Sequence, residues 1–90
     1  MPTQVSVDLS LYPLTPDYEG PIIAFIKRLH DQEGIQVATN QLATQLTGDY
    51  DRVMEVLTEA MRPTLADDTP CSFVIKLLNV ATTPNQAATL

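Results

Sequence analysis

Polar side chains alternate with apolar ones along the segment Val5–Tyr12. Residues two apart on a β-strand point to the same face, so this pattern predicts a strand with one apolar and one polar face. The polar row consists of Ser6, Asp8, Ser10 and Tyr12, and the apolar row of Val5, Val7, Leu9 and Leu11. Short hydroxyl and carboxyl groups and a tyrosine ring can be covered by a ligand or a partner without burying long charged side chains. The alternative is a polar face that only meets water.

Other kinds of chemistry have less support in the residue types. His30 and Cys71 are the only histidine and the only cysteine, and one of each does not build a zinc site. Cys71 has no visible histidine partner for nucleophilic catalysis, and His30 fits better as a basic residue near the end of a helix. The three glycines, at positions 20, 34 and 48, do not form a phosphate-binding loop. We therefore expect neither a metal ion nor a catalytic residue.

Length and charge narrow the possibilities further. The 90 residues suffice for one domain with a modest core, so oligomerisation would add stability. A net charge of −6 argues against nucleic-acid binding and suits a cationic small molecule, although acidity can also serve solubility alone. No apolar run is long enough to span a membrane, and the N-terminus shows no secretion signal. The single cysteine excludes an internal disulfide, and we expect a cytoplasmic protein.

Two helices are predicted from apolar residues with helical spacing. The first covers about Pro21–Glu33, with Gly20 as its N-cap and Gly34 as its stop signal. The second begins after Asp49, a favourable N-cap residue. Pro63 is expected to kink or end this second helix and to leave at most a short extra turn.

Three further strands are predicted from apolar runs and turn residues. Residues 35–39 and 42–47 form two strands around the turn Asn40-Gln41, and Gly48 is expected to end the second of them. The last strand covers residues 72–79 and is apolar on both faces apart from one lysine. The complete order is strand, helix, strand, strand, helix, strand.

This order is that of a ferredoxin-like βαββαβ sandwich of the α+β class. It implies an antiparallel sheet with strand order 4-1-3-2 and both helices on one face. Residues 1–80 would form the domain, and residues 81–90 a frayed C-terminal tail. The other sheet face would carry Val74 and Leu78, whose exposure suggests a homodimer or a dimer of dimers built on that face.

Two segments resemble a known family. Val5–Leu14 and Leu42–Val56 look like the single-domain thiamine-binding proteins, the YkoF-like group, and the resemblance spans roughly residues 4–80. It implies a ferredoxin-like fold, assembly into dimers and tetramers, and non-catalytic binding of thiamine or its hydroxymethylpyrimidine moiety. The chain departs from the family's pattern at Asn40-Gln41, where Gly-Pro is usual, and at Thr47, where an acidic residue is usual.

The ligand that the resemblance implies can be compared with the available side chains. Thiamine offers an aminopyrimidine edge, a thiazolium cation and a hydroxyethyl group, so its site needs a carboxylate or amide, an aromatic or anionic group, and hydroxyls. The candidate ligand-binding residues are Asp8, Ser10, Tyr12, Asn40, Thr44 and Gln45. The position of Thr44 between Leu42 and Leu46 places it on the helix side, whereas Asp8 and Ser10 should face away. The six residues therefore need not share one pocket.

Each candidate residue also has a purely structural interpretation. Asp8 can pair with Lys76 across neighbouring strands, Tyr12 can anchor an interface, and Asn40 can simply shape a turn. The function has alternatives too. A thiamine carrier, buffer or sensor competes with a regulatory oligomerisation module that binds another small ligand. A small ferredoxin-like enzyme is the third class, and it would need an acid–base group in its cleft.

Overall fold

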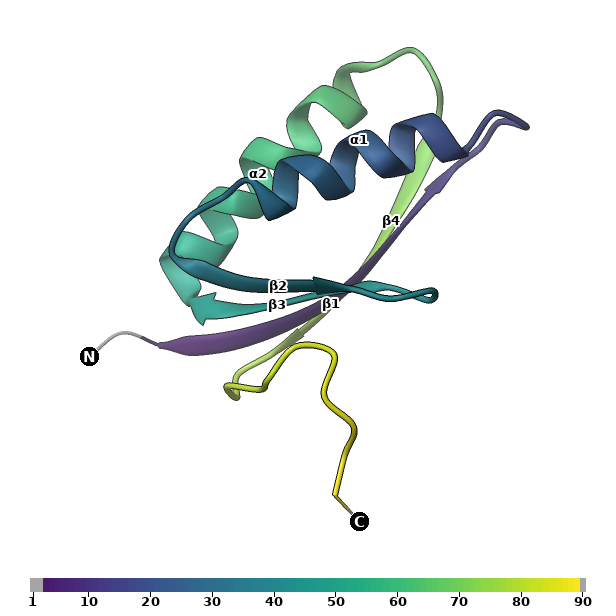
Figure 1. Ribbon diagram of the computed structural model, residues 1–90. Coiled ribbons are helices and arrows are strands. Elements are labelled where there is room, and N and C mark those ends of the chain that lie inside the picture. Colours follow the sequence, from purple (N-terminus) through teal and green to yellow (C-terminus); the bar gives the residue numbers. More distant parts are fainter. Residues whose placement is uncertain (1–2, 90) are drawn as a thin grey trace.

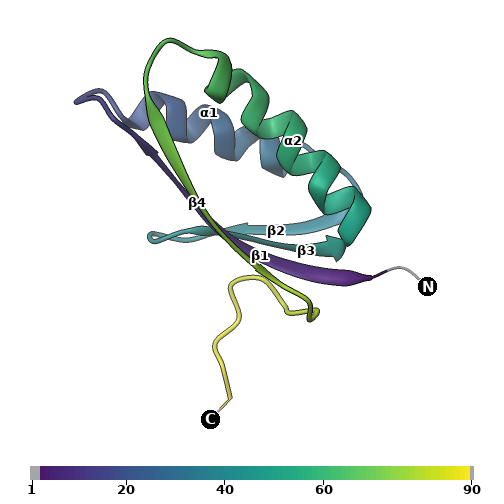
Figure 2. The same ribbon diagram turned by 180° about the vertical axis from the view of Figure 1, so that it is seen from behind.

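The computed structural model describes residues 3–89 and contains six elements in the predicted order. They are β1 (Gln4–Pro13), α1 (Glu19–His30), β2 (Ile35–Thr39), β3 (Thr44–Asp49), α2 (Tyr50–Ala66) and β4 (Cys71–Leu78). All strand pairs are antiparallel and the sheet order is β2-β3-β1-β4, which confirms the predicted 4-1-3-2 arrangement. Both helices cover one face of the sheet (Figure 1), and the view from behind shows the C-terminal tail on the other side (Figure 2). The fold is a ferredoxin-like α+β sandwich.

The core lies between the central strand β1 and the two helices. The apolar row of β1 is almost completely buried, as its alternation predicts. It packs against an apolar stripe from each helix. The buried cluster consists of Val5, Val7, Leu9, Leu11, Phe25, Leu29, Leu46, Val53, Val56, Leu57 and Ala60. Phe25 also meets Phe73 of β4 edge to face, with ring centroids 5.0 Å apart. Burial of these side chains is the main force that holds the helices on the sheet.

The strand register assigns every side chain to a face. Asp8 lies opposite Gln45 and Lys76, so these three share the open face, meaning the sheet face without helices. Val74 and Leu78 pair with serines of the polar row and therefore also lie on the open face, as predicted. Both are exposed, as are Ile75 and Leu77 on the helix side, because β4 is an edge strand that the helices cover only near Phe73.

The first helix begins earlier than predicted. It starts at Glu19, with Tyr18 rather than Gly20 at the N-cap position, and ends at His30. Pro21 is tolerated inside the first turn because the N–H groups there have no intrahelical partner. Gly34 does not follow the helix directly, but its φ of +82° turns the chain into β2, a conformation that favours glycine.

The second helix continues through Pro63 and ends at Ala66, within the short extra turn that the sequence allows. Proline cannot donate a hydrogen bond to the preceding turn, so this end of α2 needs other support. Arg28 of α1 contacts this end next to the Glu59 carbonyl that Pro63 leaves without a donor: its Nε donates to the Ala60 carbonyl at 2.9 Å and its Nη2 to Thr64 Oγ1 at 2.6 Å. At the other end, Asp49 occupies the N-cap position as predicted, but its side chain makes no capping hydrogen bond.

The predicted strand 42–47 is displaced by two residues. Asn40 Oδ1 accepts hydrogen bonds from the backbone N–H groups of Leu42 and Ala43, which holds both residues in the hairpin turn. Leu42 is consequently 89% exposed instead of lying in a strand. Gly48 does not end β3 but lies within it. A Cβ atom at position 48 would approach Ile35 Cγ2 to 3.0 Å, so a larger residue here would force the Ile35 side chain to shift.

The tail after β4 turns back under the sheet, where the sequence predicted a frayed end. Ser6 Oγ donates a hydrogen bond to the Val80 carbonyl at 2.6 Å and accepts one from the Thr82 N–H at 2.9 Å. Further along, the Asn85 N–H donates to Gln45 Oε1 at 2.7 Å. The tail therefore covers part of the open face (Figures 1 and 2). Within the described part of the chain, neither helix has the length and apolar character needed to cross a membrane.

Candidate functional site

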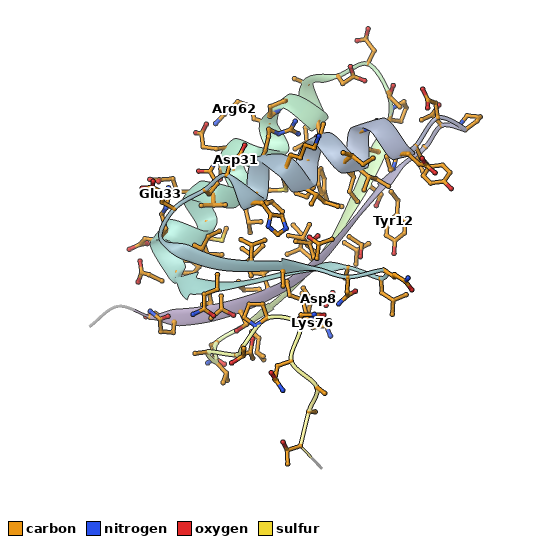
Figure 3. All side chains as sticks on the ribbon, viewed as in Figure 1. Asp8, Tyr12, Asp31, Glu33, Arg62 and Lys76 are labelled. Carbon is orange, nitrogen blue, oxygen red and sulfur yellow. The ribbon has the colours of Figure 1, made fainter. Side chains whose placement is uncertain are left out.

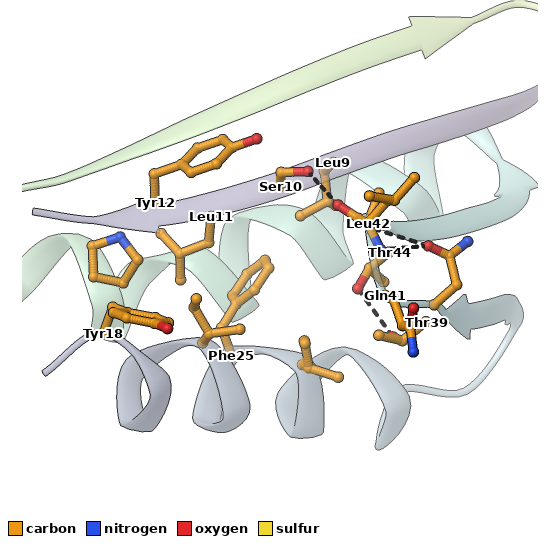
Figure 4. A pocket seen from close by; sticks show the side chains of 15 residues that line it. Leu9, Ser10, Leu11, Tyr12, Tyr18, Phe25, Thr39, Gln41, Leu42 and Thr44 are labelled. Carbon is orange, nitrogen blue, oxygen red and sulfur yellow. Dashed lines mark hydrogen bonds between the residues drawn. The ribbon is translucent and has the colours of Figure 1, made fainter.

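A groove of about 330 Å³ opens between α1, the end of β1 and the β2–β3 hairpin. It exists because the strands have unequal lengths: β3 begins at Thr44, opposite Leu9, while β1 continues to Pro13. The groove is lined by Leu9, Ser10, Leu11, Tyr12, Pro13, Tyr18, Ile22, Phe25, Ile26, Thr39, Asn40, Gln41, Leu42, Ala43 and Thr44. Figure 4 shows Phe25 reaching from α1 towards Leu11, with the hairpin residues at the other end.

The backbone of Leu11 gives this groove a hydrogen-bonding edge. In an antiparallel strand the N–H and C=O of one residue point to the same side, and the side alternates along the chain. The Leu14 N–H donates to the Pro70 carbonyl at 2.8 Å, so the odd-numbered residues of β1 point away from β4. Leu9 meets Thr44 on that side, but Leu11 lies beyond the start of β3. Within residues 3–89, the N–H and C=O of Leu11 find no backbone partner.

The walls of the groove are aromatic and aliphatic. Phe25 is buried at the base, while Tyr12 and Tyr18 are about half exposed at the rim. No lining residue carries a charged side chain. Such walls suit a flat, uncharged ring, and the tyrosine faces can also attract a cation near the opening.

Two threonine hydroxyls at the hairpin end connect the groove to a histidine. Thr44 is only 3% exposed, and its Oγ1 lies 3.0 Å from Thr39 Oγ1. Thr39 Oγ1 in turn lies 2.9 Å from Nε2 of His30, in the last turn of α1. Figure 4 shows the bond between the two threonines. Both hydroxyls belong to the lining, so a ligand in the groove could share in this chain of hydrogen bonds.

Of the six residues predicted from sequence, the structure brings four to the groove. Ser10, Tyr12, Asn40 and Thr44 line it, whereas Asp8 and Gln45 do not. The expected separation of Thr44 from Asp8 is confirmed, because the register puts them on opposite faces.

Asp8 and Gln45 bind each other on the open face. Gln45 Nε2 donates to Asp8 Oδ2 at 3.1 Å. Lys76 lies opposite Asp8 in the register, and Figure 3 shows both side chains below the sheet. Among the described residues, however, the ion pairs join Arg52 to Glu55 and Arg62 to Glu59. Asp8 and Lys76 are therefore cross-strand neighbours that do not form an ion pair in the described part of the chain.

Asn40 shapes the hairpin rather than presenting a free amide. Its Oδ1 holds the turn through the N–H groups of Leu42 and Ala43, and its Nδ2 donates to Asn85 Oδ1 of the tail at 3.1 Å. Ser10 Oγ makes a long contact of 3.4 Å to the Leu42 carbonyl. The hairpin wall of the groove is thus held from β1 and from the tail.

Several lining groups could not be found by motif. Tyr18, Phe25 and Thr39 lie far apart in sequence. They line the same groove only because α1 passes above the end of β1, beside the hairpin. The apolar helical stripe indicated Phe25 as inward-facing, but it carries no information about a neighbouring groove. The N–H and C=O of Leu11 lack a partner because β3 begins at Thr44, two residues later than the strand predicted from the sequence.

A second, smaller hollow of about 200 Å³ lies where α1 begins and α2 ends. Its charged groups already have structural partners: Arg28 supports the last turn of α2, and Asp67 accepts hydrogen bonds from Thr69. The backbone N–H of Thr69, followed by its hydroxyl, lowers the pKa of Asp67 from its usual value. Nowhere in residues 3–89 do three or more His, Cys, Asp or Glu side chains gather as metal ligands would.

Comparison with solved structures identifies the same fold in proteins from several organisms, three of which illustrate the range. A hypothetical protein from Methanocaldococcus jannascii superposes with a TM-score of 0.74 at 22% identity, over 93% of this chain and 88% of that one. A domain of unknown function from Bacillus cereus gives 0.65 at 18% identity, over 92% and 82% of the two chains. A Thermotoga maritima protein provisionally assigned to thiamine biosynthesis/salvage gives 0.54 at 19% identity, over 80% and 81%. These identities show a shared fold.

No curated protein matches the sequence. The YKOF-related family, in contrast, matches residues 4–74, a span that runs from the start of β1 into β4 and includes the whole groove. The chain therefore belongs to the YKOF-related family.

Proposed function

We propose that this protein binds the aminopyrimidine moiety of thiamine, or free hydroxymethylpyrimidine, reversibly and without chemistry. The observation that carries the proposal is the free N–H and C=O of Leu11 at the edge of a groove with aromatic walls. An aminopyrimidine has a ring nitrogen that accepts a hydrogen bond next to an amino group that donates one. This edge complements the N–H and C=O of one residue, much as a neighbouring strand would.

The surrounding groups support the same ligand class. Phe25 and Tyr18 provide faces for a flat ring, and Tyr12 adds its ring at the rim. Thr44 pairs with Leu9, two residues from Leu11, and provides a hydroxyl for the second hydrogen of the amino group. The thiazolium cation of thiamine would lie towards the open rim, where the tyrosine rings and the net charge of −6 favour it. The family supports a thiamine-related ligand, and so does the description of the Thermotoga maritima protein.

This proposal differs from the sequence-based one in its polar contacts. Asp8 and Gln45 take a structural role on the open face, and Ser10, Tyr12 and Thr44 remain as candidate ligand contacts. Recognition would rest on ring shape and neutral hydrogen bonds. The lining includes no carboxylate, lysine, arginine or histidine, which favours a cytoplasmic carrier, buffer or sensor over an enzyme with acid–base groups.

Calorimetric titration with thiamine and with hydroxymethylpyrimidine tests the proposal. Thr44→Val removes the hydroxyl from the groove and should weaken binding about three- to tenfold, the usual value of one neutral hydrogen bond. Thr47→Val is the matched control, because Thr47 is a similarly buried threonine of β3 that faces the other side of the sheet. It should leave the affinity unchanged, and so should Asp8→Asn.

Two results would contradict the proposal. Absence of heat and of thermal stabilisation with both ligands at millimolar concentration would exclude the ligand class. If Thr47→Val or Asp8→Asn weakens binding while Thr44→Val does not, the ligand lies on the open face and the groove is not the site.

We also propose that the chain assembles with itself, as a dimer or a dimer of dimers. The tail binds over β1 and β3, which leaves the exposed Val74 and Leu78 of β4 available on the open face. Leu78→Asp should reduce the mass measured by light scattering, whereas Thr89→Asp, on an exposed tail residue, should not. A monomer at micromolar concentrations of the unmodified protein would exclude this assembly.

A further inference from the structure

We infer that His30 is a positioning residue that determines whether Thr44 offers the groove a hydrogen-bond donor or an acceptor. The inference deepens the proposed function, because it names a specificity determinant for the same groove. His30 itself does not line the groove and acts through Thr39.

The geometry is a continuous chain of three side chains. His30 Nε2 lies 2.9 Å from Thr39 Oγ1, and Thr39 Oγ1 lies 3.0 Å from Thr44 Oγ1. A hydroxyl has one proton to donate, so each threonine can point its proton along the chain in only one direction at a time. When Thr39 gives its proton to His30, it has none left for Thr44, so the direction at one end restricts the direction at the other.

Protonation of His30 fixes the direction of its own bond to Thr39. Both nitrogens of an imidazolium ring carry protons, so Nε2 must donate to Thr39. The proton of Thr39 is then available for Thr44, and when Thr39 donates it, the proton of Thr44 is free to point into the groove. Only in this state can the groove present a donor, which matches a carbonyl oxygen or an unprotonated ring nitrogen.

The neutral ring permits the opposite direction. When the proton is on Nδ1, Nε2 accepts from Thr39, and Thr39 in turn accepts from Thr44. The lone pairs of Thr44 then face the groove and match an amino group. The preference between a 4-amino pyrimidine and its 4-oxo counterpart should therefore shift towards the amino compound as His30 loses its proton.

The surroundings of the chain contain few competing charges. Charged side chains next to His30 in sequence are Lys27 and Asp31, with Glu33 in the turn that follows. The segment packed against this end of α1, residues 35–44 of β2 and the hairpin, contains no charged residue. The other helix, α2, also packs against α1, and its Arg52 donates to the Glu33 carbonyl. His30 is the titratable member of the chain itself, and His30→Gln separates its effect from those of Arg52 and Glu33.

The first experiment needs no ligand. An NMR titration across the range in which histidine titrates, roughly pH 5–8, should move the methyl signal of Thr44 together with the ring signals of His30. Thr39→Val interrupts the chain and should uncouple the two signals, whereas Thr47→Val should preserve the coupling. Equal movement of the Thr44 signal in wild type and Thr39→Val, or no movement in wild type, would overturn the inference.

The second experiment measures selectivity by calorimetry with 4-amino- and 4-oxo-5-hydroxymethyl-2-methylpyrimidine. In wild type the ratio of their affinities should change about fivefold or more in favour of the amino compound between the two ends of the pH range. Thr39→Val and His30→Gln should lose this pH dependence, apart from the part that comes from titration of the ligands, which is the same for every variant.

The outcomes separate the two claims. If neither compound binds, the proposed function fails, and the NMR coupling alone decides whether the His30–Thr39–Thr44 chain transmits protonation. If both compounds bind but the ratio responds to pH identically in wild type and His30→Gln, the proposed function stands and the inference about His30 is wrong.

Discussion

The two faces of β1 are held by different forces, although they belong to the same ten residues. The helix face packs apolar side chains into a core that excludes water. The open face is held by individual polar contacts, such as those of Ser6 with Thr82 and of Asp8 with Gln45. Apolar packing is strong and non-directional, whereas each polar contact depends on one pair of atoms.

This difference separates folding from function. A slip of the strand by one residue would bring the polar row into the core, so the helix face specifies the register. The open face can exchange its partners at lower cost, which allows the tail to occupy part of it and leaves Val74 and Leu78 for the second copy that we propose. The groove lies between the helix face and the open face, at the end of β1 that β3 does not reach.

The largest predicted effect is on the helix face. Leu46→Ala removes a fully buried side chain, 0% exposed, and should lower the free energy of unfolding by about 2–5 kcal/mol. Leu42→Ala is the matched control: the same substitution four residues away, at a side chain that is 89% exposed, should change it by less than about 0.5 kcal/mol. Urea unfolding measures both. Equal destabilisation by the two variants would mean that the hairpin is packed in solution.

A smaller effect is predicted where the tail meets the open face. Ser6 is 6% exposed, and its hydroxyl serves both the Val80 carbonyl and the Thr82 N–H. Ser6→Ala should therefore cost about 1–3 kcal/mol and should increase the hydrogen-exchange rate of the Thr82 amide. Ser10→Ala, whose single contact is 3.4 Å long, should do neither. Unchanged exchange at Thr82 in Ser6→Ala would show that the tail is not held by this serine.

Sequence reasoning succeeded where many residues contribute to one periodic pattern. The alternation of β1 and the apolar stripes of the helices predicted the element order, the sheet topology and the facing of Thr44. Periodicity averages over many positions, so a single irregular residue does not mislead it.

It failed where a single contact decides the outcome. The amide of Asn40 holds Leu42 in the hairpin turn, outside the strand that was predicted to begin there. The tail has no pattern at all, because Thr82 and Asn85 bind through individual hydrogen bonds. The groove depends on all three kinds of feature: the position of α1, the start of β3 and the hairpin that the tail helps to hold. For this reason only part of its lining could be predicted.

The smallest predicted effect concerns charge on the open face. Asp8 and Lys76 lie directly opposite each other, and such cross-strand pairs contribute roughly 0.2–1 kcal/mol. A double-mutant cycle with Asp8→Asn and Lys76→Met, measured by urea unfolding, should give a coupling energy below about 1 kcal/mol that decreases as salt is added. Lys76 is exposed, and Asp8 Oδ2 already accepts a hydrogen bond from Gln45. We therefore expect the ammonium group of Lys76 to add little stabilisation to the Asp8 carboxylate. The same cycle between Asp8→Asn and Gln45→Met should retain its coupling at high salt, since that contact is a hydrogen bond to a neutral amide. If instead the Asp8–Lys76 coupling is the larger and survives salt, charge pairing holds the open face, and the division between an apolar face and a face of replaceable neutral contacts would have to be abandoned.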